Sequence, residues 1–130
     1  VLDGLSDLNL HTLDLSYNRY IPVQQLTRSM FQNLTSLRVL RFCRYIQKQS
    51  FLAYPHVVLA LLTNLEELYI TGLRYVIFGP GFRNMTSLRK LSLSGRNCFM
   101  SGLTNATFKN VNQITSLNIS DCDLEDVEKK

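Results

Sequence analysis

The apolar residues of the chain follow one frame that recurs five times. In its first copy, Leu10, Leu13 and Leu15 occupy the first, fourth and sixth slots, and Asn18 occupies the ninth. The copies begin at five apolar residues: Leu10, Leu37, Leu65, Leu88 and Ile114. These starts lie 27, 28, 23 and 26 residues apart. A recurrence of this kind indicates a chain built from stacked structural units.

A second set of apolar residues tests the frame independently. Phe31, Phe82 and Phe108 each precede the start of a copy by six residues. The stretches FQNLTSLRVL and FRNMTSLRKL are near copies, and FKNVNQITSL is a more divergent third version. Both the spacing and the twenty-three leucines are typical of the leucine-rich repeat, whose period is about 20–29 residues.

The repeat predicts an α/β solenoid, a horseshoe segment of about five repeats with a parallel concave β-sheet. Its convex side should consist of loops and short helical turns. The fourth and sixth slots lie two residues apart, so a short strand directs both side chains to the same face. No single repeat can bury that face alone, and stacked neighbours are needed to form a core. We expect residues 1–130 to be one leucine-rich repeat segment of a longer ectodomain, because neither end carries the polar closing structure that terminal repeats need.

The segments between the strands are harder to predict. The ninth slot, which normally holds Asn, contains Tyr45, Leu73 and Arg96 in the middle repeats, so we expect irregular turns there. The aliphatic run 57–62 is compatible with a short convex helix or a buried extended segment, and periodicity does not decide between them. The Gly/Pro-containing stretch 77–82 predicts a turn.

The outward slots predict three columns of side chains across the concave sheet. The central column contains Asp14, Arg41, Tyr69, Ser92 and Asn118; a second contains Thr12, Val39, Glu67, Lys90 and Ser116; a third contains Ser16, Cys43, Thr71, Ser94 and Ser120. The charges allow two interpretations. One is cross-strand pairing worth roughly a few tenths of a kcal/mol. The other is a polar recognition patch centred on Arg41 and Tyr69, because Arg and Tyr are enriched in binding hot spots. The candidate ligand or partner contacts are Asp14, Arg38, Arg41, Arg44, Glu67, Tyr69 and Lys90.

Charge and composition argue against several other functions. The formal net charge of +4 is small and scattered, so we expect no nucleic-acid partner from this segment. The longest aliphatic run is far shorter than a membrane span, and any membrane attachment would come through a span outside these residues. We expect no enzyme activity, because the sequence has no glycine-rich phosphate loop, nucleophile–base pair or carboxylate cluster. The two histidines are isolated and the three cysteines are scattered, which predicts no metal site and no cofactor.

Four Asn-x-Ser/Thr sequons favour a secreted protein. They begin at Asn33, Asn84, Asn105 and Asn118, whereas chance gives roughly one or two in a chain of this composition. Asn33 and Asn84 occupy equivalent places in the repeat, where a glycan is sterically reasonable. Asn118 lies between the inward Leu117 and Ile119, so its side chain should face the concave sheet surface.

The combination F-x-N-[LM]-T-S-L-R-x-L followed by L-x-L-S resembles a Toll-like receptor ectodomain. It occurs at Phe31 to Leu40 and at Phe82 to Ser94, and LDLSYN at Leu13 to Asn18 is similar to the strand signature of that family. The resemblance implies a type I membrane receptor of innate immunity or development. Such ectodomains bind microbial or protein ligands, form homo- or heterodimers, and signal through a cytoplasmic Toll/interleukin-1 receptor domain. It also implies a location on the extracellular side, at the cell surface or in the endosomal lumen.

Two other functions remain open at this point. One is a secreted or anchored leucine-rich repeat protein of adhesion or structure, without a signalling domain. The other is a cytosolic leucine-rich repeat scaffold, which would carry reduced cysteines and no glycans. The flanking sequence and the occupancy of the sequons distinguish these functions from a receptor.

Overall fold

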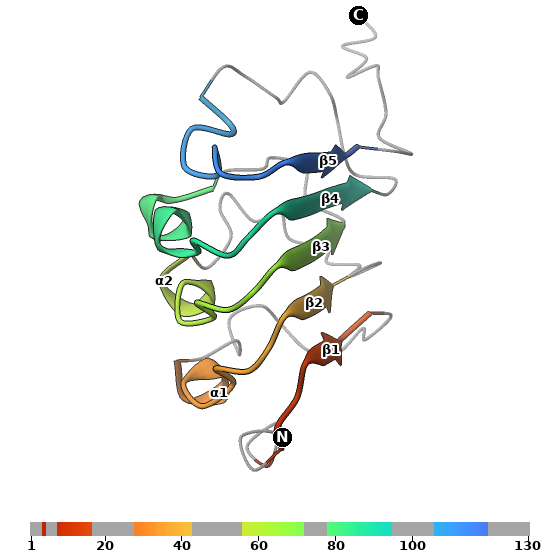
Figure 1. Cartoon of the computed structure of the whole chain (residues 1–130), viewed down its shortest axis with the longest axis vertical. Helices are drawn as coiled ribbons and strands as arrows, with labels where there is room; N and C mark the ends of the chain where they lie inside the picture. The colour runs from red at the N-terminus through yellow and green to blue at the C-terminus, as the bar shows by residue number, and fades with distance from the viewer. Residues whose placement is uncertain are drawn as a thin grey trace, which may run out of the picture.

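The computed structural model describes Gly4 and residues 8–16, 28–42, 56–71, 78–94 and 106–119. Its strands are β1 (Thr12–Asp14), β2 (Val39–Phe42), β3 (Glu67–Thr71), β4 (Lys90–Ser94) and β5 (Ser116–Asn118). They form one parallel sheet in the order β1-β2-β3-β4-β5 (Figure 1). Two short α-helices, α1 (Arg28–Phe31) and α2 (His56–Leu59), and a 3-10 helix, η3 (Pro80–Asn84), precede β2, β3 and β4. This arrangement is compatible with the predicted α/β solenoid.

The strands pair in the register that the frame predicts. The fourth-slot residues Leu13, Leu40, Leu68, Leu91 and Leu117 are direct cross-strand partners. Leu40, Leu68 and Leu91 are fully buried, because each lies between two neighbours that present the same side chain. The sixth-slot residues Leu15, Ile70 and Leu93 are also buried. The alternation of a strand therefore places one apolar row after another on the inner face.

The approach to each strand has the same backbone hydrogen bonds in four repeats. The amide of Leu34 donates to the carbonyl of Phe31 at 3.0 Å, and that of Leu37 donates to Leu34 at 3.1 Å. The corresponding bonds recur from Leu62 to Leu59, Leu65 to Leu62, Met85 to Phe82, Leu88 to Met85, Val111 to Phe108 and Ile114 to Val111. Successive tight turns of this type bring the side chains of the Phe slot and the first slot to the same core.

The aliphatic run 57–62 is helical at its start, which resolves the two alternatives that its periodicity left open. Residues 57–59 belong to α2, and Leu59 and Leu62 are buried at 1% and 0% exposure. Leu59 precedes Leu65 by six residues, so it takes the slot that Phe31 and Phe82 take in their repeats. The apolar anchor is thus present in this repeat with leucine in place of phenylalanine.

The Gly/Pro stretch forms a turn as predicted, in the specific form of the 3-10 helix η3. Pro80 stands at its beginning, where the missing amide hydrogen costs nothing. Phe82 on η3 is fully buried, and its ring meets that of Phe78 edge-on at 5.1 Å between centroids. Phe108 from the next repeat stacks on Phe78 at 6.3 Å. These three rings join the fourth and fifth repeats on the side of the turns.

Several expectations lie outside the described residues. They concern the ninth-slot turns at Asn18, Tyr45, Leu73, Arg96 and Cys122, the cysteines at 43 and 98, and part of the third outward column. No helix among the described ranges is long and apolar enough to cross a membrane.

Candidate recognition surface

Two of the predicted outward columns are present on the sheet. Asp14, Arg41, Tyr69, Ser92 and Asn118 are cross-strand partners in one column, and Thr12, Val39, Glu67, Lys90 and Ser116 are partners in the other. Neighbouring strands lie about 4.8 Å apart, so side chains from adjacent repeats contact one another. This face is opposite to the leucine rows.

Tyr69 is the centre of a cluster on this face. The guanidinium carbon of Arg41 lies 4.1 Å from the centroid of the Tyr69 ring, a close cation–π contact. Lys90 Nζ, from the other neighbouring strand, lies 5.4 Å from the same centroid. The Tyr69 hydroxyl donates a hydrogen bond of 2.9 Å to Glu67 Oε1. We refer to Arg41, Glu67, Tyr69 and Lys90 as the Tyr69 cluster.

The carboxylate of Glu67 pairs with Lys90. Lys90 Nζ lies 3.7 Å from Glu67 Oε1, and both side chains remain partly exposed. The adjacent Tyr69 hydroxyl, followed by the Glu67 carboxylate, raises the pKa of Lys90 above its ordinary value. Solvent screens such a pair, so it orients side chains more than it stabilises the fold. The guanidinium of Arg41 lies over the Tyr69 ring.

Asp14 lies at the edge of the Tyr69 cluster, opposite Arg41 in the register of β1 and β2. Its Oδ1 accepts a hydrogen bond of 2.9 Å from the backbone amide of Ser16. Hydrogen bonds from Ser16, with a smaller contribution from the charge of Arg41, hold the pKa of the Asp14 carboxyl below its ordinary value. The carboxylate therefore acts first as an acceptor within its own turn.

Of the other basic candidates, Arg38 is described by the structure, and it is not part of the Tyr69 cluster. Arg38 precedes β2 and is exposed, and its backbone carbonyl accepts hydrogen bonds from the amides of Glu66 and Glu67 at 2.8 and 3.0 Å. Arg44 lies outside the described residues. Of the two candidate arginines that the structure describes, Arg41 is the one that lies on the concave face.

Three of the four sequon asparagines fall within the described ranges, and all three are exposed. Asn33 and Asn84 lie at equivalent positions, two residues after a buried Phe. Asn118 lies on β5 in the central outward column, paired in register with Ser92. Asn105 is outside the described residues. The exposure makes glycosylation sterically feasible at the three described sites.

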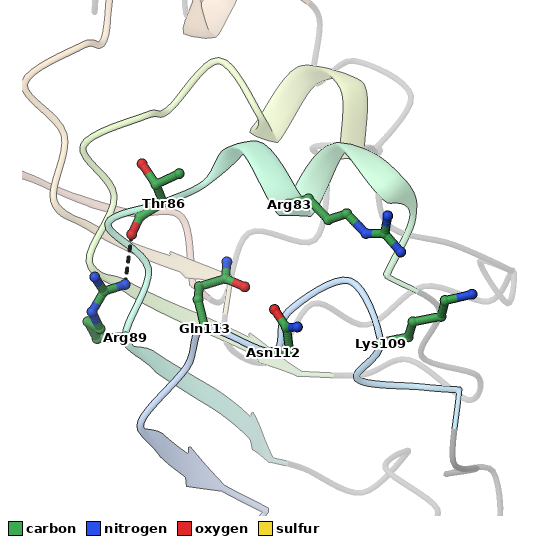
Figure 2. Close-up of a pocket in the computed structure, with 6 residues that line it drawn as sticks. All are labelled: Arg83, Thr86, Arg89, Lys109, Asn112 and Gln113. Atoms are coloured by element: carbon green, nitrogen blue, oxygen red, sulfur yellow. Dashed lines mark hydrogen bonds between the residues drawn. The ribbon is translucent and has the colours of Figure 1, made fainter.

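A hollow that the sequence pattern did not indicate lies on the side of the sheet where the turns lead into the strands. It has a volume of about 590 Å³ and is lined by Arg83, Thr86, Arg89, Lys109, Asn112 and Gln113 (Figure 2). We call it the lateral hollow. Its residues come from the fourth and fifth repeats, outside the strands, so the outward columns did not include them. Aligning the turns would have found it, because Arg83 and Lys109 both directly follow the Phe slot.

No group of three or more His, Cys, Asp or Glu side chains with metal-binding geometry occurs in the part of the chain that the structure describes. The described surface presents aromatic, cationic and hydrogen-bonding groups on a regular backbone, which are groups suited to contacts with a partner. These features are those of a leucine-rich repeat-like stack with a polar concave face.

Comparison with known proteins agrees with this class. The chain is 34% identical over 122 residues to Toll-like receptor 4 of Pinctada imbricata, an alignment that covers 92% of the chain. The chain spans 13% of the length of that protein. No protein-family model matches the sequence. The similarity runs through nearly all repeats and indicates a segment like that of a leucine-rich repeat receptor.

Proposed function

We propose that this chain is a ligand-recognition and dimerisation segment of a Toll-like receptor ectodomain, on the extracellular side of a single-pass membrane protein. The similarity to Toll-like receptor 4 across 92% of the chain carries the assignment. The partner is a protein or microbial ligand, and binding uses a rigid curved surface without catalysis. Its signal would pass to a cytoplasmic domain outside these residues.

The Tyr69 cluster is the contact site that the geometry supports best. Its tyrosine ring lies near two cations, and its hydroxyl donates a hydrogen bond to Glu67. A side chain already ordered in this way loses little conformational entropy on binding. Arg and Tyr are also enriched among residues that dominate interface energy.

Asn118 affects how a ligand approaches this face. It is exposed and lies two strands from Tyr69, or about 10 Å at the usual strand spacing. A glycan at Asn118 would obstruct the concave face near β5 and would favour lateral or convex contacts. Mass spectrometry of protein expressed in eukaryotic cells measures this occupancy, and an unmodified Asn118 would remove the obstruction.

The proposed function is tested first by the sequence that follows residue 130 in the complete transcript. A membrane span followed by a Toll/interleukin-1 receptor domain is expected. A span or lipid anchor without that domain would instead support the adhesion protein, and neither feature together with unglycosylated native protein would support the cytosolic scaffold.

The recognition surface is tested by signalling from the complete ectodomain, fused to a Toll/interleukin-1 receptor domain in reporter cells and exposed to bacterial cell-wall fractions. We expect the double variant R41A/Y69A to lower the response at least 5-fold at equal surface expression. The matched control T12A changes the same face at β1 and should respond as wild type. Equal responses from all three proteins would exclude the Tyr69 cluster as the contact site.

A further inference from the structure

The lateral hollow is distinguished by its charge. Its six lining residues comprise three cations, Arg83, Arg89 and Lys109, together with three uncharged hydrogen-bonding side chains, Thr86, Asn112 and Gln113. Among the described residues that line the hollow, none is acidic, aliphatic or aromatic. A cluster of cations attracts anions through the local field.

This charge is specific to the groove between the fourth and fifth repeats. The positions equivalent to Arg83 and Lys109 hold Gln32 and Ala60 in the groove between the second and third repeats. In the groove between the third and fourth repeats, the position equivalent to Arg89 holds Glu66. At the three equivalent positions, the groove of the second and third repeats therefore holds one cation, Arg38, and that of the third and fourth holds Arg83 with Glu66, whereas the lateral hollow holds three cations.

Cations lie at both ends of the row of lining side chains (Figure 2). Arg83 and Lys109 extend toward one end, Arg89 lies at the other, and Asn112 and Gln113 lie between them (Figure 2). This spacing suits a ligand with separate anionic groups joined by a polar stretch.

Two lining side chains are fixed in place. Arg89 Nη1 donates to the carbonyls of Thr86 at 2.7 Å and Leu88 at 3.0 Å. Gln113 Nε2 donates to the carbonyls of Phe82 at 3.2 Å and Met85 at 3.0 Å. Arg89 is thus tied to the backbone of its own repeat and Gln113 to that of the preceding repeat, which reduces the ordering cost of binding.

We propose that the lateral hollow binds a sulfated polysaccharide. Arginine guanidinium groups match the geometry of sulfate oxygens, and hydroxyl and amide side chains suit sugar hydroxyls. A protein partner would call for the buried aromatic or aliphatic anchor typical of hot spots, and single-stranded nucleic acid would call for stacking rings. The lining residues provide neither. This site is separate from the Tyr69 cluster and does not depend on the proposed signalling function.

The test is binding of size-defined heparin oligosaccharides to the protein expressed with its native flanking sequence, followed by calorimetry at two salt concentrations. We expect R83A/K109A to weaken binding at least 10-fold and R89A about 5-fold, with affinity falling as salt rises because the contacts are ionic. The matched control is R38A, which removes the same charge from the equivalent position of another groove and should change affinity less than 2-fold. Circular dichroism confirms that each variant is folded.

Three results would contradict the proposal. Equal loss from R38A and R89A would mean that heparin follows overall charge and not the lateral hollow. Binding of poly-glutamate or duplex RNA as tight as that of heparin, with the same sensitivity to R83A/K109A, would assign the hollow to another class of anion. Removal of the neighbouring sequon by N84Q should leave the affinity unchanged or raise it, because a glycan there would lie beside the hollow; a loss with N84Q would contradict the placement.

Discussion

The third and fifth repeats show how strongly the same side chain depends on its neighbours. Leu68 on β3 and Leu117 on β5 occupy the same slot and are linked through the register of the sheet. Leu68 is fully buried, whereas Leu117 is 42% exposed. β3 lies between β2 and β4, while β5 has β4 on one side and ends the described sheet. Burial in this molecule is therefore a property of stacked pairs and not of a single repeat.

The concave face follows the same rule. Tyr69 contacts a cation from each neighbouring strand, Arg41 from β2 and Lys90 from β4. Asn118 on β5 has one neighbouring strand, and its column partner there is Ser92. A recognition cluster built from three strands is thus most ordered where a repeat has neighbours on both sides.

The largest expected effect separates the two leucines. Leu68→Ala should lower the free energy of unfolding by about 3 kcal/mol, because it leaves a cavity in a closed core. Leu117→Ala should lower it by less than about 1 kcal/mol, because much of that side chain is already in water. Urea unfolding of both variants measures the difference, and equal losses would show that β5 is covered in solution.

A smaller effect on stability is expected at the apolar residue that lies six positions before the start of each of the two repeats. The third repeat holds the buried Leu59 and the fifth holds the half-buried Phe108. Phe108→Leu should therefore lower the free energy of unfolding by only about 1 kcal/mol, because the same slot already holds leucine in the third repeat. The loss comes from the stacking of Phe108 on Phe78. Thermal unfolding measures this cost, for which Leu59→Ala is the control at about 2–3 kcal/mol. A cost for Phe108→Leu as large as that of the control would mean that the fifth repeat requires an aromatic ring.

Tyr69→Phe tests the hydrogen bond of the Tyr69 hydroxyl on the concave face. It removes the hydroxyl that donates to Glu67 and keeps the ring between Arg41 and Lys90, so about 0.5–1 kcal/mol of stability should be lost. The pKa of Lys90 should also fall toward its ordinary value, since the Tyr69 hydroxyl is the main cause of its increase. Heteronuclear NMR titration of the Lys90 side chain measures this shift. An unchanged Lys90 pKa would show that the hydroxyl lies elsewhere in solution.

The smallest effect concerns pH and Asp14. Because its pKa is lowered in the folded state, its contribution to stability is complete above the pKa of an unfolded aspartate, about 3.9. That contribution is lost as the pH falls through the lower folded pKa. Asp14→Asn keeps an acceptor for the Ser16 amide and should remove this acid-dependent part of the unfolding midpoint. A pH profile identical to that of the wild type would contradict the assigned interaction.

The sheet was predictable from the sequence because its apolar frame determines both the register of the strands and the face of the sheet on which each side chain lies. The paired columns through Leu68 and Tyr69 follow from counting slots alone. The repeat anchor at Leu59 was less visible, since leucine replaces the phenylalanine that marks three of the other copies, and a short aliphatic run gives no clear period. The lateral hollow was missed because its shape arises from turns packed against turns, and Arg83 and Lys109 come close only when two repeats stack.

One feature of the backbone bears on how such a chain tolerates change. At each strand entrance a single carbonyl, that of His11, Arg38, Glu66 or Arg89, accepts two amide hydrogens from the next repeat at 2.8–3.0 Å. These paired bonds align each repeat with the one before it at the same point, although the repeat starts lie from 23 to 28 residues apart. The length of the return segment is thereby uncoupled from the position of the strand. Insertions and deletions in the returns can alter one side of the molecule while the spacing of the concave residues stays constant.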